Sequence, residues 1–135
     1  MSFEDIVRVT FTGQRLLALM GAELSRVASG EVDIALRFRD DLAQQNGSLH
    51  AGTIAAIADT ACGLAALSMM DAGSGVVSVE FKLNLLVPAV GERFLARGRV
   101  VRAGKNITFT EGEVVADEKT VVATITATMM QRRPR

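Results

Sequence analysis

The sequence of 135 residues has no tryptophan or tyrosine, one cysteine, one histidine and no net charge, with 15 basic residues against 15 acidic ones. A single cysteine cannot form an internal disulfide, and one cysteine with one histidine cannot supply the clustered ligands of a usual zinc site, so we expect no bound metal. Binding to a phosphate backbone normally needs a basic face, and the few basic clusters here are interleaved with apolar residues. Nucleic acid is therefore not expected as a partner.

The chain also lacks an uninterrupted apolar run of membrane-spanning length. Residues 54–70 come nearest, but Asp59 interrupts them, small residues dominate them and alternating segments follow. We interpret this segment as a buried helix and expect no membrane association. Residues 1–5 are acidic and lack the basic region and apolar core of a secretory signal, which predicts a cytoplasmic protein.

Hydrophobic residues make up 49% of the chain, which suffices for a single globular domain over residues 1–135. Residues 2–20 have helical spacing with a break at Gly13, which predicts one or two short covering helices. A long helix is expected from Leu49 to Met70. Residues 131–135 are expected to form a solvated tail.

Six segments have the pattern of strands, and the short connections between them favour antiparallel hairpins. They are Ala22–Ala28, Glu31–Phe38, Val76–Val87, Glu92–Arg102, Asn106–Ala116 and Thr120–Met130. In the third strand five apolar residues alternate with polar ones, which predicts one buried face made of Val77, Val79, Phe81, Leu83 and Leu85. The long helix is apolar nearly all round, so a curved sheet wrapped around it is the natural cover, an α+β arrangement.

The most informative segment is residues 44–52, Gln-Gln-Asn-Gly-Ser-Leu-His-Ala-Gly, which leads into the apolar helix in which Asp59 is the only charge before Asp71. An ionised carboxylate buried without a partner is very costly, so a lone aspartate in such a helix is usually exposed, paired or functional. The residue pattern by itself leaves open whether Asp59 is reactive or is an ion-paired or interfacial residue.

These residues resemble those of a known family. An amide residue, then glycine, then Leu49-His50-x-Gly52, with an aspartate nine residues after the histidine, is similar to the hotdog-fold acyl-CoA thioesterases of the phenylacetate-type branch. A second similarity is the strand that runs into Val87-Pro88-Ala89, and the resemblance extends from about residue 22 to residue 130. It implies a hotdog fold, in which a curved antiparallel sheet of about six strands wraps around one long central helix.

The resemblance also implies roles for individual residues. The helix carboxylate, here Asp59, hydrolyses the thioester either as a nucleophile or as a general base on water. The backbone N–H after the histidine, here that of Ala51, polarises the thioester carbonyl, although glycine is common at this position. Gly52 belongs to the substrate-binding segment. Ser78 matches a hydroxyl near the carboxylate, and it is also consistent with a polar residue on the open face of a strand.

His50 is expected to support the site, by fixing the loop and the helix entry and by a side-chain hydrogen bond near the substrate carbonyl. Gln44 lies six residues before His50, where similar enzymes place an amide that positions the carbonyl or the attacking water. Asn46 is the competing candidate, although Asn46-Gly47 also fits a plain turn. Cys62 is expected to be a small core residue, because no second histidine is available to activate it.

The resemblance implies that the substrate is an acyl-CoA and that no cofactor is needed, since CoA is part of the substrate. Active sites in this family lie between subunits, so it implies a homodimer or, as a dimer of dimers, a homotetramer. Candidate contacts for the CoA phosphates are polar residues near loops, Lys82, Arg102, Lys105 and Asn106. The acyl group itself is not readable from the sequence.

Two other functions remain open at this point. A non-catalytic hotdog module could bind acyl-CoA, but such a module needs no carboxylate beside the thioester. A hotdog hydratase or dehydratase also uses an acidic residue and a histidine, but those enzymes resemble different loop motifs. A Ser-His-Asp hydrolase is disfavoured because the sequence has no Gly-x-Ser-x-Gly elbow.

Overall fold

The computed structural model describes all residues from 1 to 135. Its helices are α1 (Phe3–Thr12), α2 (Arg15–Met20) and α3 (Ala51–Leu67), with a short 3-10 helix, η1, over Asp40–Leu42. Its strands are β1 (Glu23–Ala28), β2 (Glu31–Arg37), β3 (Gly75–Leu85), β4 (Arg93–Ala103), β5 (Ile107–Ala116) and β6 (Thr120–Arg132). None of the helices is long and apolar enough to cross a membrane.

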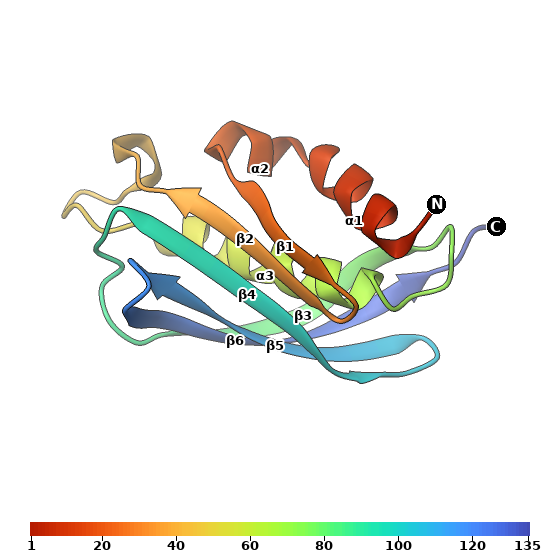
Figure 1. Ribbon diagram of the computed structural model, residues 1–135. Helices are drawn as coiled ribbons and strands as arrows, with labels where there is room; N and C mark the ends of the chain where they lie inside the picture. The colour runs from red at the N-terminus through yellow and green to blue at the C-terminus, as the bar shows by residue number, and fades with distance from the viewer.

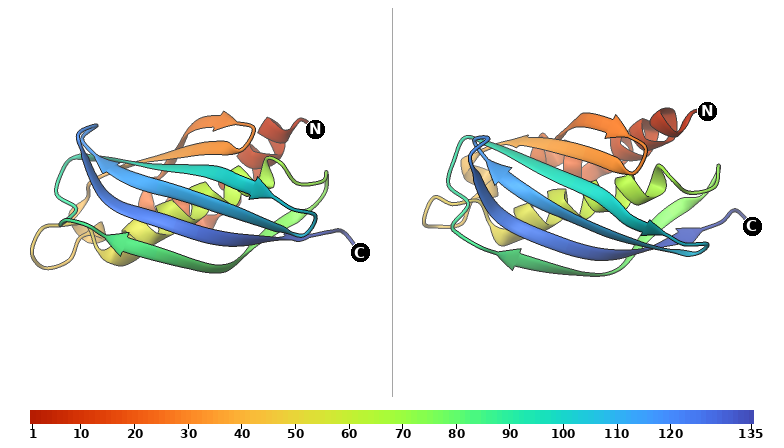
Figure 2. Two further views of the ribbon diagram at one scale, coloured as in Figure 1. Left: turned by 90° about the horizontal axis from the view of Figure 1, so that it is seen from below. Right: turned by 60° about the horizontal axis from the view of Figure 1, so that its bottom comes forward.

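The six strands form one antiparallel sheet in the order β1-β2-β4-β5-β6-β3. The sheet curves around α3, with α1 and α2 beside the β1 edge and β3 at the opposite edge (Figure 1). Both views in Figure 2 show the strands crossing in front of α3. This confirms the predicted α+β hotdog architecture, because a helix that is apolar nearly all round needs a sheet on several sides.

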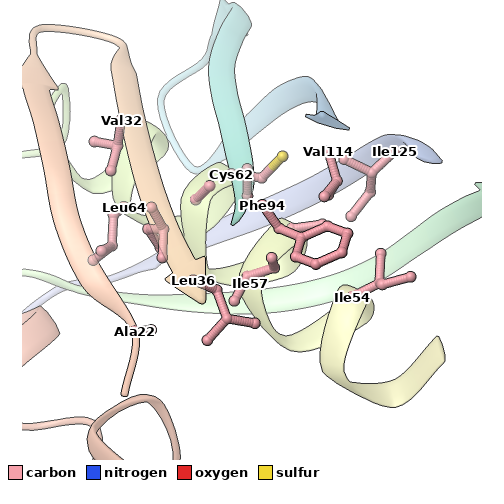
Figure 3. Packing of buried hydrophobic residues seen from close by; sticks show 14 of the residues in the cluster. Ala22, Val32, Leu36, Ile54, Ile57, Cys62, Leu64, Phe94, Val114 and Ile125 are labelled. Carbon is pink, nitrogen blue, oxygen red and sulfur yellow. The ribbon is translucent and has the colours of Figure 1, made fainter. Parts of the chain in front are cut away.

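A single core joins the helix to the sheet. Ile54 and Ile57 of α3 lie near Phe94 of β4, and Leu64 lies near Val32 of β2 (Figure 3), within a cluster of 27 buried residues. The tightest approach is at Gly98 of β4, where a Cβ atom would lie 2.4 Å from the backbone carbonyl carbon of Ala61 in α3. The absence of a side chain at Gly98 therefore lets the backbone of the sheet touch the backbone of the helix.

The long helix is shorter than the predicted range of Leu49 to Met70. His50 is its N-cap and Ser68 its C-cap, so α3 has 17 residues and is about 25 Å long at 1.5 Å per residue. The Ser68 hydroxyl donates to the Ala65 carbonyl and accepts from the Gly30 N–H of the β1–β2 turn. This bond links the last turn of α3 to the sheet, and the sequence periodicity could not reveal it because Gly30 is 38 residues away.

The prediction that the five apolar residues of the third strand share one buried face is wrong. A β-bulge between Ser78 and Glu80 shifts the alternation by one residue, so Ser78 and Phe81 pair with the buried Met129 and Ala127 of β6 and point toward α3. Val77, by contrast, lies opposite the exposed Met130. Burial of the five side chains is also incomplete, because β3 is an edge strand. Val79 in the bulge is 55% exposed, and Phe81 and Leu85 after it are 43% and 52% exposed.

The tail expected over residues 131–135 begins later than predicted, although residues 132–135 are exposed. Gln131 and Arg132 belong to β6. Arg133 then donates to the side chain of Asn106 at 2.5 Å and to the carbonyl of Lys105 at 2.7 Å, and it pairs with Asp71 at 3.3 Å. The end of β6 is therefore tied to the β4–β5 turn and to the loop that follows α3.

Candidate active site

The loop that precedes α3 is held at both ends by backbone hydrogen bonds. The N–H of Leu49 donates to the carbonyl of Ala89, just after β3, and the N–H of His50 donates to the carbonyl of Leu42 in η1. Within the loop, the N–H of Gln44 donates to Ser48, and Gly47 adopts the left-handed φ of 88° that closes the turn. This bonding fixes the direction in which the chain enters α3.

His50 caps α3 with its own side chain. Its Nδ1 atom accepts a hydrogen bond of 2.8 Å from the N–H of Gly52. This bond satisfies one of the N–H groups that a helix leaves free at its first turn. A Cβ atom on residue 52 would lie only 3.0 Å from Nδ1, so glycine suits this position. The imidazole thus takes part in holding the helix entry, through Nδ1.

The first turn of α3 retains one free donor. The N–H groups of Thr53 and Ile54 donate to the carbonyl of His50, and that of Gly52 donates to the imidazole. The N–H of Ala51 has no partner within the chain. It lies at the positive end of the helix dipole, where a developing negative charge is stabilised. This is the backbone group that the resemblance assigns to the thioester carbonyl.

Asp59 is half-buried on α3 and receives a hydrogen bond of 2.7 Å from the hydroxyl of Ser78. No lysine, arginine or histidine of this chain forms a salt bridge with it. Asp59 therefore has no ion-pair partner within the chain, which argues against the alternative of an ion-paired structural residue. Ser78 reaches the carboxylate because the β3 bulge turns its side chain toward α3. Ser78 therefore does not lie on the open face of the strand, because its side chain points toward Asp59.

The two candidate amides differ in their surroundings. The Oδ1 atom of Asn46 accepts from both the N–H and the hydroxyl of Ser48, at 3.1 and 2.7 Å, so this side chain closes the loop. The exposed side chain of Gln44 makes only a long contact of 3.5 Å from its Nε2 atom to the same hydroxyl. Asn46 therefore uses its side-chain oxygen within the loop, whereas Gln44 has only this long contact.

The four residues expected at the CoA phosphates do not form one cluster. Lys82 lies opposite Thr126 and Arg102 opposite Phe109, at separate places on the sheet. Lys105 and Asn106 lie together at the β4–β5 turn, where the side chain of Asn106 accepts from Arg133. The sequence reasoning missed Arg133 because its tail position gave no sign of this contact.

Two further groups of residues bear on the chemistry. Burial raises the pKa of the Cys62 thiol to about 11, so Cys62 is protonated at neutral pH and behaves as a core residue. No three histidine, cysteine, aspartate or glutamate side chains come together as a possible metal site. The polar groups gathered around the start and middle of α3 are Gln44, His50, the Ala51 N–H, Asp59 and Ser78.

Comparisons with known proteins agree with this fold and motif. The model of the thioesterase superfamily matches residues 46–123. A solved structure of a thioesterase family protein from Silicibacter pomeroyi is 37% identical, covers 98% of this chain and 100% of its own, and has a TM-score of 0.95. The PaaI protein from the E. coli phenylacetic acid degradation operon has a TM-score of 0.88 at 18% identity, over 98% of this chain and 94% of its own. A candidate esterase from Saccharolobus solfataricus is 27% identical over 99 residues, which are 73% of this chain and 70% of that protein.

Proposed function

The chain belongs to the thioesterase superfamily and is a thioester hydrolase with the hotdog fold, and from this premise we propose that it cleaves acyl-CoA into a carboxylic acid and CoA. The observation that carries the proposal is the Asp59 carboxylate, which is half-buried, has no cation partner within the chain and is oriented by the Ser78 hydroxyl. The family assignment favours this reaction over a non-catalytic acyl-CoA-binding module and over a hydratase or dehydratase.

In the proposed mechanism the thioester carbonyl oxygen accepts a hydrogen bond from the N–H of Ala51. Negative charge grows on this oxygen as the carbonyl carbon becomes tetrahedral, and the N-terminal end of α3 stabilises that charge. His50 keeps the helix entry in place and can donate a second hydrogen bond from Nε2. The side-chain amide of Gln44, which has only a long contact to Ser48, positions the carbonyl or the attacking water.

Asp59 then supplies the attack by one of two routes. As a general base it takes a proton from water, whose oxygen bonds to the carbonyl carbon while the C–S bond breaks and the thiolate of CoA leaves. As a nucleophile its oxygen bonds to the carbonyl carbon while the C–S bond breaks and the thiolate of CoA leaves, which gives a mixed anhydride. Water then hydrolyses the anhydride, which releases the acid and restores the carboxylate, and the proton released from water passes to the thiolate. In both routes water and thioester are consumed, and acid and thiol are formed.

The direct test is a panel of aromatic and aliphatic acyl-CoA substrates, with release of free CoA thiol followed by a colorimetric reagent. We expect turnover of at least one substrate class by the purified protein. An absence of thiol release from every member of the panel would contradict the proposed function.

The roles of the two amides can be separated by substitution. Replacing Gln44 by alanine should lower kcat on the order of 10² to 10³-fold, the usual cost of one positioned donor. Asn46→Ala should cost less in kcat, because the Asn46 side chain is bonded to Ser48, and should instead lower the stability of the loop. Steady-state kinetics and thermal unfolding of both variants give the comparison, and the reverse order of kcat losses would transfer the catalytic role to Asn46.

We further propose that the active unit is a homodimer formed through β3, and that a homotetramer arises from two such dimers. β3 has a free edge in the sheet order, and apolar side chains stay exposed along it and in the segment that follows, including Leu86 at 53%. An unprotected apolar edge strand is a site for pairing with another chain. A second copy related by a two-fold axis would add its own β3 antiparallel to the first.

Such a dimer would bring the two halves of the site together. The His50 loop is bonded to Ala89, beyond the C-terminal end of β3, whereas Asp59 is bonded to Ser78 near the N-terminal end of β3. Antiparallel pairing places the end of one β3 beside the beginning of the other. The Ala51 N–H of one subunit then faces the Asp59 of its partner, whereas residues 50 and 59 of one chain are separated by roughly 13 Å along the axis of α3.

Mixing of inactive subunits tests this arrangement. One parent would carry Gln44→Ala with His50→Ala, and the other Asp59→Asn. We expect activity to return after subunit exchange, because one of the two sites in the mixed dimer is built from two intact halves. Sedimentation should show a dimer or tetramer. An active monomer, or no recovery of activity despite exchange demonstrated by a fluorescent label, would overturn the shared site.

A further inference from the structure

A hollow of about 380 Å³ lies between α2 and the first two turns of α3. One side is formed by Leu16, Leu19 and Met20 of α2, and the other by His50, Gly52 and Ala56. His50 and Gly52 are also the residues that set the helix entry beside the Ala51 N–H. The hollow therefore lies beside the end of α3 at which the thioester carbonyl is proposed to bind, and the two share His50 and Gly52. We refer to it as the α2–α3 hollow.

The apolar side of this hollow is left uncovered by the chain itself. Leu16 is 55% exposed and Leu19 is 73% exposed, although both belong to a helix whose Leu17 and Met20 are buried. The removal of exposed leucine surface from water is favourable, so an apolar group placed here would be stabilised. On the α3 side, Gly52 and Ala56 are small and stand one helical turn apart, which keeps the space open.

Hydrogen bonds of Arg39 connect the α2 side of the hollow to the neighbouring segment. The guanidinium of Arg39 donates to the carbonyl of Leu19 at 3.3 Å and forms two bonds with the carboxylate of Asp41, at 3.0 and 2.9 Å. Gly21 ends α2 with a left-handed φ of 76° that places it close to Arg39. These contacts connect the end of α2 to the segment that leads to the His50 loop.

The charges at the rim are already paired with each other. Arg39 and Asp41 satisfy one another, and the pairing lowers the pKa of the Asp41 carboxyl from its usual value. No cation of the hollow is thus left free for a carboxylate on the substrate. A charged acyl group such as succinyl would lose part of its hydration there without gaining an ion-pair partner from Arg39. The lining therefore favours an uncharged, apolar acyl group.

We infer that the α2–α3 hollow binds the acyl group of the thioester, and that Leu16, Leu19 and Ala56 determine acyl specificity. This inference rests on the proposed function and names its substrate class, an acyl-CoA with an uncharged aliphatic or aromatic acyl group. If each CH₂-sized group takes about the 30 Å³ of a water molecule, the 380 Å³ of the hollow accommodates roughly 13 such groups. Medium-chain and aryl substrates fit this space, and an acetyl group leaves most of it empty.

The test compares acetyl-, hexanoyl-, octanoyl-, phenylacetyl- and succinyl-CoA in the wild-type protein and three variants. We expect wild-type kcat/KM to be at least about 10-fold higher for octanoyl- than for succinyl-CoA. Ala56→Leu fills the hollow and should lower kcat/KM for octanoyl-CoA about 10-fold or more, while acetyl-CoA changes less than about 3-fold. Ala72→Leu, the same substitution in the exposed loop after α3, is the matched control and should leave every ratio unchanged.

Leu19→Gln is a second variant whose effect does not depend on the packing of the core. Leu19 is exposed, so its replacement should not disturb the fold. It should raise KM for octanoyl-CoA several-fold more than KM for acetyl-CoA. Equal effects of Ala56→Leu and Leu19→Gln on short and long substrates, or no effect on either, would overturn the inference while leaving the hydrolase intact. Failure of the wild-type protein to hydrolyse any of the five substrates would instead count against the proposed function.

Discussion

Replacement of Asp59 by asparagine should lower kcat by roughly 10³-fold or more while the fold is retained. The substitution removes the proton acceptor or nucleophile, and general base catalysis alone is worth about 10² to 10⁴ in rate. Asparagine has nearly the same volume as aspartate, and its amide oxygen can still accept the hydrogen bond from the Ser78 hydroxyl. The expected variant is therefore folded, able to bind substrate and inactive.

The measurement is steady-state thiol release with the best substrate of the panel, together with thermal unfolding of both proteins. Asp5→Asn in the first turn of α1 provides a matched control, since it makes the same change in a capping carboxylate far along the chain from the site. It should alter stability slightly and kcat not at all. A kcat of Asp59→Asn within a few-fold of the wild type would remove Asp59 from the catalytic role.

Replacement of Gly98 by alanine should lower the free energy of unfolding by about 3 kcal/mol or more. The added Cβ would lie 2.4 Å from the carbonyl carbon of Ala61 and 2.6 Å from the nitrogen of Cys62, both backbone atoms of α3. A side chain could rotate away from such a clash, but a helix backbone can only move as a whole. Overpacking of a core typically costs 1–3 kcal/mol, and here the neighbouring packing around α3 would be disturbed as well.

Urea unfolding at a fixed protein concentration gives this difference, because the stability of an oligomer depends on its concentration. Gly13→Ala is the matched control, since residue 13 has a φ of −75° and a Cβ there would meet no atom closer than 3.5 Å. It should be neutral or up to about 1 kcal/mol stabilising, because alanine reduces the freedom of the unfolded chain. A Gly98→Ala variant as stable as wild type would show that α3 and β4 are not packed backbone to backbone.

Much of the architecture follows from local patterns in the sequence. The apolar helix, its beginning near His50 and the strand segments are encoded in residues a few positions apart, and short connections favour antiparallel pairing. The same local reasoning selects Asp59, because one charge in an apolar helix is conspicuous whatever surrounds the helix. The resemblance to thioesterases adds the assignments of Ala51 and Gln44 to these positions.

The contacts that complete the site depend on chain segments that are distant in sequence. The bulge that turns Ser78 toward Asp59 is set by the pairing of β3 with β6, and alternation along β3 alone predicted the wrong face. Likewise the close approach at Gly98 depends on how α3 packs on β4.

The sequence by itself determined which elements form and which carboxylate stands out, because periodicity and capping act over one or two turns of the chain. Only the tertiary structure decided that Ser78 donates to this carboxylate, that the Asn46 oxygen is bonded to Ser48, and that α2 borders a hollow beside His50. These features depend on cross-strand register and on the packing of elements far apart in sequence, which a local residue pattern does not encode.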